Sequence, residues 1–223
     1  MFKKVVFIVV VSGLLLTVFY WKEIRKKTQT ITAQKRVETF MSGSLQEGDI
    51  IFQTSGSNQS KAIQLATKSR YSHMGILYKQ GEQWGVYEAV QPVKLTALKE
   101  WIQRGEQGHY VIKRLKNAKR ILTPETLSKM KMAGTKYKGK DYDIYFEWSD
   151  EKIYCSELVW KIYKEGAGIE LGKLEKLRDF DLSSTIVRQK LKERYGETLP
   201  LNEEVISPAA IFDSKQLETI GSD

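Results

Sequence analysis

Two short runs rich in β-forming residues, separated by four residues, constrain the fold of this chain most strongly. The runs are YSHMGILYK at residues 71–79 and WGVYEAV at residues 84–90, and the QGEQ between them has the composition of a turn. Such a pair predicts an antiparallel β-hairpin. A hairpin is stable in water when further strands or helices cover it, so the rest of the chain must supply that cover.

Short strands and amphipathic helices are predicted on both sides of the hairpin. The hydrophobic periodicity and the turn and cap residues give strands at residues 48–53 and 109–115 and helices at residues 57–68, 95–104 and 123–133. The last of these helices has a clear start, because Thr123 can act as the N-cap and Pro124 suits the first helical position.

The C-terminal half contributes an aromatic loop and one well-marked helix. Residues 137–148 are rich in aromatic side chains and are expected to pack as a loop over another element. A helix is predicted from about Cys155 to Gly166, where glycine favours a stop. The remainder of the chain is predicted to be helical and loop-like, with Pro200 and Pro208 as breakers. Strands followed by helices in this order indicate an α+β fold.

The composition is that of a globular protein with a basic surface. The 223 residues allow one domain of ordinary size, and the formal net charge is +9. A basic excess indicates an anionic partner, such as nucleic acid or an anionic bilayer, or simply a solvated surface. No nucleic-acid-binding motif is found, so we predict no nucleic-acid partner. With two histidines, His73 and His109, no histidine-rich metal site is expected, and we predict no metal and no cofactor.

An uncharged run at residues 5–21 predicts an N-terminal transmembrane helix. At 1.5 Å per residue the run is about 25 Å long, the short end of a membrane span, and its closing Tyr20 and Trp21 suit the bilayer interface. We therefore divide the chain into a membrane anchor (1–27), a juxtamembrane linker (28–44) and a globular domain (45–223). A cleaved signal peptide is the alternative, although the nearest cleavage-like site, ending at Ala33, follows a basic segment. The side of the membrane is left open.

Cys155 is the single cysteine, and it is a candidate nucleophile. Lone cysteines are usually buried apolar residues. This one, however, stands at the start of a predicted helix, where free backbone N–H groups and the positive end of the helix dipole favour a thiolate. The same N–H groups can bind a developing oxyanion.

His73 and Glu88 lie on the two strands of the predicted hairpin, where side chains of neighbouring strands can touch. Glu88 is the single charge in its run. A carboxylate beside an imidazole fixes the tautomer and stabilises the cation, which is the role of the third group in a nucleophile–base system. The alternatives are a hydrogen-bonded core histidine and a salt bridge from Glu88 to a surface lysine such as Lys94. We take His109 as structural.

Four segments, in this order along the chain, resemble the permuted papain-like cysteine hydrolases of the NlpC superfamily, in particular the YiiX/YebB-like group: LQEGDIIFQ, YSHMGILY, VYEAV and IYCSELVWKIY. The resemblance covers about residues 45–165, and histidine precedes cysteine as in the permuted group. It implies a papain-like hydrolase domain in which the nucleophile helix packs against a short antiparallel sheet. It also implies Cys155 as nucleophile, His73 as base and Glu88 as the residue that orients the base.

Tyr154 departs from the pattern of the peptidoglycan-cleaving, unpermuted members, which usually carry an aspartate at that position. A cell-wall D-glutamyl substrate therefore does not follow from the resemblance, and we take Tyr154 as a candidate substrate-binding residue.

Together these features predict a membrane-attached enzyme that hydrolyses an amide or ester through a thioacyl intermediate. Two alternatives stay open. The same site could belong to a membrane-tethered lipid acyltransferase or thioesterase, or the chain could be a membrane-attached binding protein without activity. The expected partners are a peptide, amide or lipid-like substrate and the membrane, and the oligomeric state is left open.

Overall fold

The predicted hairpin is present in the computed structural model, which describes residues 20–21, 25 and 43–222. Its strands are β2 (His73–Gln80) and β3 (Gln83–Glu88), which pair antiparallel with Ile76 opposite Tyr87. The two strands are joined by a tight turn at Gly81, as the QGEQ segment indicates. The prediction is confirmed, with small shifts at the strand ends.

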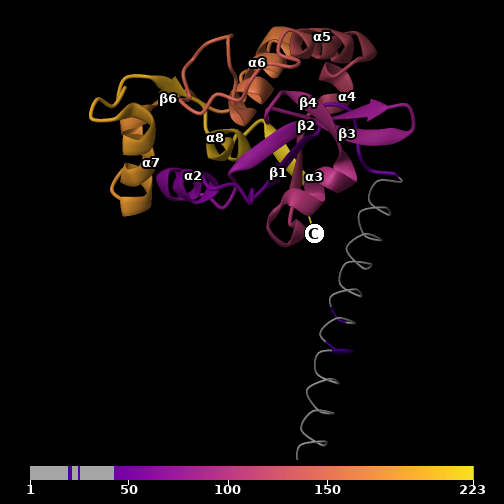
Figure 1. The fold of residues 1–223 in the computed structure, drawn as a ribbon. Helices are drawn as coiled ribbons and strands as arrows, with labels where there is room; N and C mark the ends of the chain where they lie inside the picture. The colour runs from indigo at the N-terminus through magenta and orange to yellow at the C-terminus, as the bar shows by residue number, and fades with distance from the viewer. Residues whose placement is uncertain (1–19, 22–24, 26–42, 223) are drawn as a thin grey trace, which may run out of the picture. The chain divides into compact units, whose positions relative to one another are not determined.

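Four more strands extend the hairpin into a six-stranded antiparallel sheet of order β4-β3-β2-β1-β5-β8 (Figure 1). Two of them, β1 (Ile50–Gln53) and β5 (Val111–Leu115), confirm predicted strands. The other two, β4 (Lys94–Ala97) and β8 (Leu217–Ser222), lie where the sequence predicts a helix and a tail of helices and loops. Both are short edge strands whose stability comes from pairing with β3 and β5, and local patterning does not report such pairing.

Helices are the other main regular elements of the described chain. Those predicted at residues 57–68, 123–133 and from Cys155 are confirmed, whereas the one at 95–104 begins only after β4. The helices are α2 (Ser60–Thr67), α3 (Leu98–Arg104), α4 (Ala118–Ile121), α5 (Pro124–Thr135), α6 (Cys155–Ala167), α7 (Thr185–Tyr195) and α8 (Pro208–Phe212), with 3-10 turns at Glu106–Gly108 and Leu177–Asp179. A two-stranded sheet, β6 (Glu175–Lys176) with β7 (Glu204–Val205), lies between α6 and α8 in sequence.

The main core lies between the sheet and α6. Ile50 of β1 and Met74 of β2 are fully buried in one cluster with Leu158 of α6. The residues that alternate with them, Ile51 and Leu77, are fully buried as well, and α3 packs against β3 and β4. Strands with both faces covered have a strongly specified register, so the residues at their ends are held in fixed positions. Helix α7 lies beside α2, away from α5 and α6 (Figure 1).

Helix α6 ends at a different glycine from the one predicted. It continues through Gly166, and the residue in the left-handed conformation that closes it is Gly168, with φ of 70°. Gly166 instead permits close packing of α5, because a Cβ atom there would lie 2.4 Å from the Cα of Met130. A glycine near the end of an apolar helix can therefore mark a helix contact as well as a stop.

The chain divides into two compact units, residues 1–43 and 44–223. In the first unit the structure describes Tyr20, Trp21, Arg25 and Gly43, and the predicted anchor at residues 5–21 lies almost wholly outside the described residues. Within the described ranges no helix is long and apolar enough to cross a bilayer.

Candidate active site

Cys155 is the first residue of α6 and is buried, with 2% of its surface exposed. The residue before it, Tyr154, is extended (φ −102°, ψ 168°) and acts as the N-cap. The side chain of Glu157, in the first turn, accepts a hydrogen bond from the Tyr154 amide. An amide in the first turn has no acceptor within the helix, so the N–H of Cys155 is available to an anion next to the sulfur.

His73 begins β2 and joins Cys155 to Glu88. Its Nε2 lies 2.6 Å from Glu88 Oε2, and the side chain also hydrogen-bonds that of Cys155. Burial lowers the pKa of the imidazole, but the hydrogen bonds and negative charges of Cys155 and Glu88 raise it to about 9. The ring is therefore cationic at neutral pH. The structure brings the three predicted residues together.

Glu88 ends β3 and is held by four donors while fully buried. Besides His73, the donors are the Thr96 hydroxyl at 2.6 Å, the Trp101 indole N–H at 2.8 Å and the Arg104 guanidinium. Burial raises the pKa of Glu88, but these hydrogen bonds and the two cations bring it below its ordinary value. The carboxylate is thus ionised at neutral pH. Lys94 is its register partner in the sheet, but the carboxylate points to the other donors.

Gly75 allows the two strands to approach closely next to the site. A Cβ atom there would lie 2.4 Å from Val86 Cγ1 and 3.3 Å from the Cβ of Glu88. The missing side chain leaves the space through which Glu88 reaches His73. On its other side the imidazole stacks on Trp101, with ring centroids 5.8 Å apart, so its plane is fixed.

A series of side-chain hydrogen bonds also connects α7 to the site. No sequence motif indicated these contacts. Arg194 donates to Gln59 Oε1, and Gln59 Nε2 donates to the hydroxyl of Tyr142 at 2.9 Å. Arginine is a donor alone, so it sets the orientation of the Gln59 amide. The Tyr142 hydroxyl accepts from that amide and keeps its own hydrogen for another acceptor.

Tyr142 stays protonated beside the sulfur. Burial and the negative charge of Cys155 raise the pKa of its hydroxyl well above the ordinary value. A neutral O–H aimed at the site can donate to a negative oxygen that forms there. The aromatic loop at residues 137–148 was the one signal for this residue, since it was expected to pack over another element. Nothing in the sequence distinguished Tyr142 from its aromatic neighbours.

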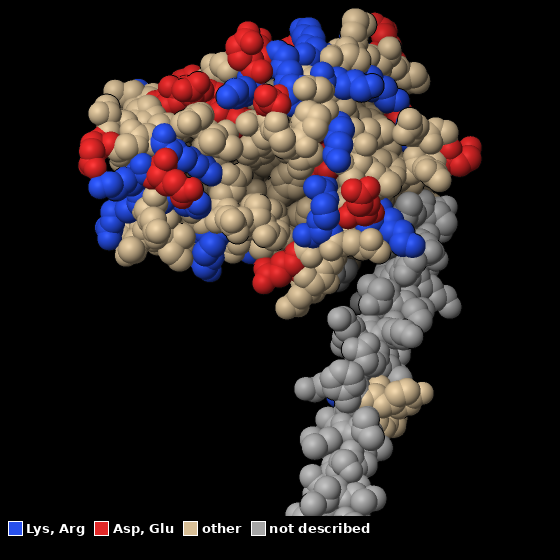
Figure 2. Space-filling view, in the orientation of Figure 1, with Lys and Arg blue, Asp and Glu red and all other residues tan. Residues whose placement is uncertain are grey.

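Two hollows of different character meet at Gln59 and Tyr142, which line both. The first includes Cys155 and is narrow, about 90 Å³, with walls formed almost entirely of apolar side chains, among them Ile63, Phe146, Leu177, Phe180, Val187 and Ile206. The second includes His73 and is larger, about 630 Å³; most of the residues that line it have polar side chains, although apolar atoms make up the larger part of its wall. On the face shown in Figure 2 the molecule is hollowed near its middle, and the surrounding side chains are mostly uncharged.

Tyr154 contributes its ring, and not its hydroxyl, to the apolar hollow. The side chain is buried, and its hydroxyl accepts a hydrogen bond from the Ile206 amide at 3.1 Å. The neighbouring Ser156 hydroxyl donates to the Ile206 carbonyl at 2.7 Å. The two residues flanking Cys155 thus fasten the start of α6 to the segment before α8.

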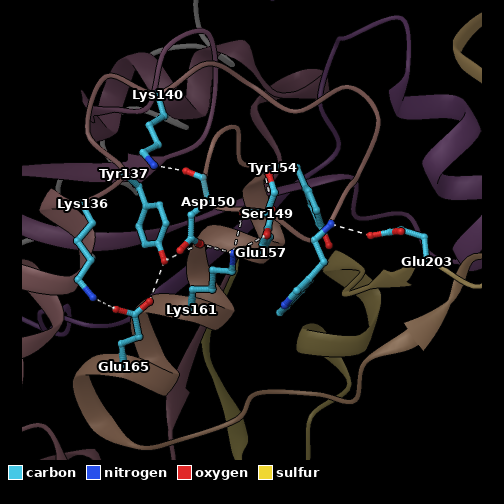
Figure 3. Close-up of polar contacts among 11 residues, drawn as sticks. Lys136, Tyr137, Lys140, Ser149, Asp150, Tyr154, Glu157, Lys161, Glu165 and Glu203 are labelled. Atoms are coloured by element: carbon cyan, nitrogen blue, oxygen red, sulfur yellow. Dashed lines mark hydrogen bonds and ion pairs between the residues drawn. The ribbon is translucent and has the colours of Figure 1, made fainter.

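A buried lysine fastens the aromatic loop to α6 (Figure 3). Lys161 contacts the Ser149 carbonyl and the Asp150 carboxylate, each at 2.7 Å, and Glu157 at 2.9 Å. Glu203 holds the same loop by accepting from the Trp148 amide at 2.8 Å. Burial raises the pKa of Glu157 to about 8, although Lys161 opposes the shift. These contacts position the loop that carries Tyr142.

Comparison with known protein families places these observations in context. A family model described as permuted papain-like amidase enzyme, YaeF/YiiX, C92 family, matches residues 44–221. The match covers α6 and the whole sheet except the last residue of β8, Ser222.

Two similar proteins from Escherichia coli share most of the chain. The uncharacterized protein YiiX of strain K12 is 51% identical over 178 residues, which are 80% of this chain and 87% of that protein. The crystal structure of the metalloprotein yiiX of O157:H7 has a TM-score of 0.77 and 50% identity, and the match covers 80% of this chain and 97% of the other. The described part of the present chain has no group of three or more His, Cys, Asp or Glu placed to hold a metal ion.

Proposed function

The chain belongs to the permuted papain-like amidases of the YaeF/YiiX type, a family of cysteine-hydrolase character, and from this membership we propose that it cleaves an amide or ester through a thioacyl intermediate on Cys155. The observation that carries the residue roles is the buried imidazole of His73, hydrogen-bonded to Cys155 and to the ionised Glu88. In these roles Cys155 is the nucleophile, His73 the acid and base, and Glu88 the residue that orients the ring.

Acylation begins with the thiolate, because a cationic imidazole beside the sulfur stabilises its negative charge. The sulfur attacks the carbonyl carbon, a C–S bond forms, and the carbonyl oxygen becomes an oxyanion. We assign the stabilisation of that charge to two donors beside the sulfur, the Cys155 amide at the start of α6 and the neutral Tyr142 hydroxyl. The C–N or C–O bond then breaks as His73 gives its proton to the departing nitrogen or oxygen.

Deacylation reverses these roles. His73, now neutral, takes a proton from water as the water oxygen attacks the thioester carbon. The C–S bond breaks, the acid is released, and the thiolate–imidazolium pair is restored. Glu88 keeps its charge throughout, because its four donors hold its pKa low.

The apolar hollow beside Cys155 supports an apolar acyl group on the substrate. It is narrow and its walls are almost free of polar surface, so it suits a slender hydrocarbon chain better than a peptide. The same feature favours a second candidate, a lipid thioesterase or acyltransferase. Either enzyme would form the same intermediate; a thioesterase would release the acyl group to water, whereas an acyltransferase would pass it to an amine or alcohol.

The first prediction uses the fact that the chain has one cysteine, so every thiol reaction reports on Cys155. We expect iodoacetamide to label the protein at neutral pH at least about tenfold faster than it labels glutathione, because a cationic imidazole beside the sulfur makes it a stronger nucleophile. His73→Ala should remove the acceleration. His109→Ala is the matched control and should keep it. Labelling no faster than glutathione would contradict the proposal.

Turnover and mass analysis complete the test. With p-nitrophenyl esters of increasing chain length, Cys155→Ala and His73→Ala should reduce kcat/KM by at least about a thousandfold at unchanged folding. The mass of the acidified protein should increase by that of the acyl group. Products analysed with and without added amine or alcohol acceptors separate hydrolysis from transfer. A Cys155→Ala protein with full activity would leave a binding protein as the remaining explanation.

A further inference from the structure

We propose that the polar groove beside His73 binds the leaving group of the substrate, and that this group is a small amine or alcohol carrying a carboxylate or phosphate. The inference deepens the proposed function and rests on it. It assigns the two sides of the scissile bond to the two hollows, with the acyl chain on the Cys155 side and an anionic head on the His73 side.

The position of the leaving group follows from where the proton must go. The histidine that protonates a departing atom must lie within hydrogen-bond reach of it, on the side away from the acyl group. His73 lines the polar groove and Cys155 lines the apolar hollow, while Gln59 and Tyr142 line both. A substrate whose carbonyl lies at the Gln59–Tyr142 junction therefore extends its leaving group into the groove.

The walls of the groove indicate a polar leaving group. They carry hydroxyls and amides and include Gln53, Ser55, Ser57, Ser72, Gln91 and Arg104. No aspartate or glutamate is among the lining residues, so an anion entering the groove meets no like charge there. The groove is several times larger in volume than the apolar hollow, which leaves room for a head group and its hydration water.

Arg104 supplies the group that would recognise a negative charge. One of its nitrogens bonds Glu88, and 39% of its side chain is exposed. A guanidinium has five N–H donors on a rigid plane, so an arginine that binds one carboxylate along one edge can bind a second anion along another. The Glu88 contact also fixes the plane of the guanidinium, so little side-chain entropy is lost when an anion binds.

The test compares amides that differ in the charge of the leaving group alone. N-dodecanoylglycine and N-dodecanoylglycinamide test the carboxylate, and N-dodecanoyl phosphoethanolamine and N-dodecanoylethanolamine test the phosphate. We expect kcat/KM to be at least about tenfold higher for the anionic member of one pair, mostly through KM, as for a hydrogen bond to a charged group. The pair with the larger ratio tells whether the head is of amino-acid or phosphate type.

Ser57→Asp changes the groove without touching Glu88. Ser57 lies in the segment whose Gly56 packs near the Arg104 carbonyl, so a carboxylate there repels an anionic head group. We expect this variant to lower the anionic-to-neutral ratio by about tenfold. The matched control is Ser128→Asp, on the exposed surface of α5, which should leave the ratio unchanged.

The outcomes separate the groove assignment from the proposed function. If neutral and anionic amides are cleaved equally well by an enzyme with a reactive Cys155, the groove assignment is wrong and the hydrolase proposal stands. Equal effects of Ser57→Asp on both members of a pair would overturn the assignment in the same way. If no amide or ester is turned over and Cys155 reacts like a free thiol, both proposals fail.

Discussion

Glu88 and His73 form a unit in which a buried carboxylate controls the charge of an imidazole. Glu88 is fully buried yet ionised, because four donors compensate for the loss of water. The charge on Glu88 is in turn one reason why the pKa of His73 is raised to about 9. The unit keeps the imidazole ring cationic over the pH range in which the proposed mechanism needs a thiolate at Cys155.

A second prediction concerns this unit. Glu88→Gln removes the negative charge that stabilises the imidazolium, so the pKa of His73 should fall. Because His73 must be protonated to release the leaving group, the alkaline limb of the kcat/KM profile should move from about pH 9 to lower pH, by at least about one unit.

Its control is Glu100→Gln, the same chemical change at an exposed position on α3, which should leave the profile in place. A Glu88→Gln enzyme whose alkaline limb does not move would show that the carboxylate does not tune the ring.

The catalytic residues differ in how far the sequence could reveal them. Cys155 and His73 were found because cysteine and histidine are scarce here, and Glu88 because a charge interrupts an apolar run. Gln59 and Arg104 are common residue types, and neither interrupts an apolar run, so the sequence did not single them out. Their importance arises from contacts between segments far apart in the chain, such as the bond from Arg104 to Glu88.

At the scale of elements, α6 holds the site by fastening other segments to itself. Its start binds the segment before α8 through Tyr154 and Ser156, and its second turn binds the end of the aromatic loop, at Ser149, through Lys161. Lys161 and its partner Glu157 are both largely shielded from solvent, with side chains 10% and 0% exposed. A buried pair of this kind becomes costly when one member is lost.

The third prediction follows from that pair. Lys161→Met removes the contacts with the Ser149 carbonyl and the Asp150 carboxylate and leaves the Glu157 carboxyl buried without its hydrogen-bond donor, so the free energy of unfolding should fall by about 3 kcal/mol. Urea unfolding followed by tryptophan fluorescence measures the loss. Adding Glu157→Gln to this variant should restore part of the stability, because no buried group that can ionise then remains at that position.

Lys164→Met is the control for this helix. Lys164 is 46% exposed and its ion pair with Glu170 is on the surface, so we expect a change within about 0.5 kcal/mol. An equal loss in the free energy of unfolding for the two substitutions would show that the buried contacts of Lys161 stabilise the protein no more than the surface ion pair of Lys164.

Elements with their own periodicity or caps were predictable, whereas elements made by pairing were not. Helix α5 was located by its Thr123 cap, and the Thr126 amide indeed donates to the Thr123 hydroxyl. Strand β4 has four residues and runs directly into α3, so the combined segment looks like one helix. Strand β8 depends on β5 for its hydrogen bonds, and the local sequence pattern does not predict this pairing.

At the scale of the whole molecule, one unit carries the site and the other carries the predicted anchor. The described residues of the second unit, 44–222, contain both hollows and every residue of the proposed mechanism. A membrane location would suit an apolar acyl substrate, because such molecules partition into bilayers. We propose on these grounds that residues 1–27 tether the hydrolase to a membrane.

The fourth prediction tests the tether. The full chain should sediment with membranes and resist extraction by alkaline carbonate, whereas a chain beginning at residue 44 should be released into the supernatant, because it lacks the apolar run at residues 5–21. Mass analysis of the full chain distinguishes an intact anchor from cleavage near Ala33. Recovery of the full, uncleaved chain in the soluble fraction would rule the tether out.

The solitary, shielded sulfur also has a consequence for oxidative damage. A cysteine sulfenic acid is normally rescued when a second thiol condenses with it, and these 223 residues contain no second thiol. Repair of Cys155 must therefore come from an external reductant that can enter a passage shaped for substrate. A substrate resting in the apolar hollow would then protect the sulfur from peroxide, so that inactivation by oxidants should be slowest when the enzyme is occupied.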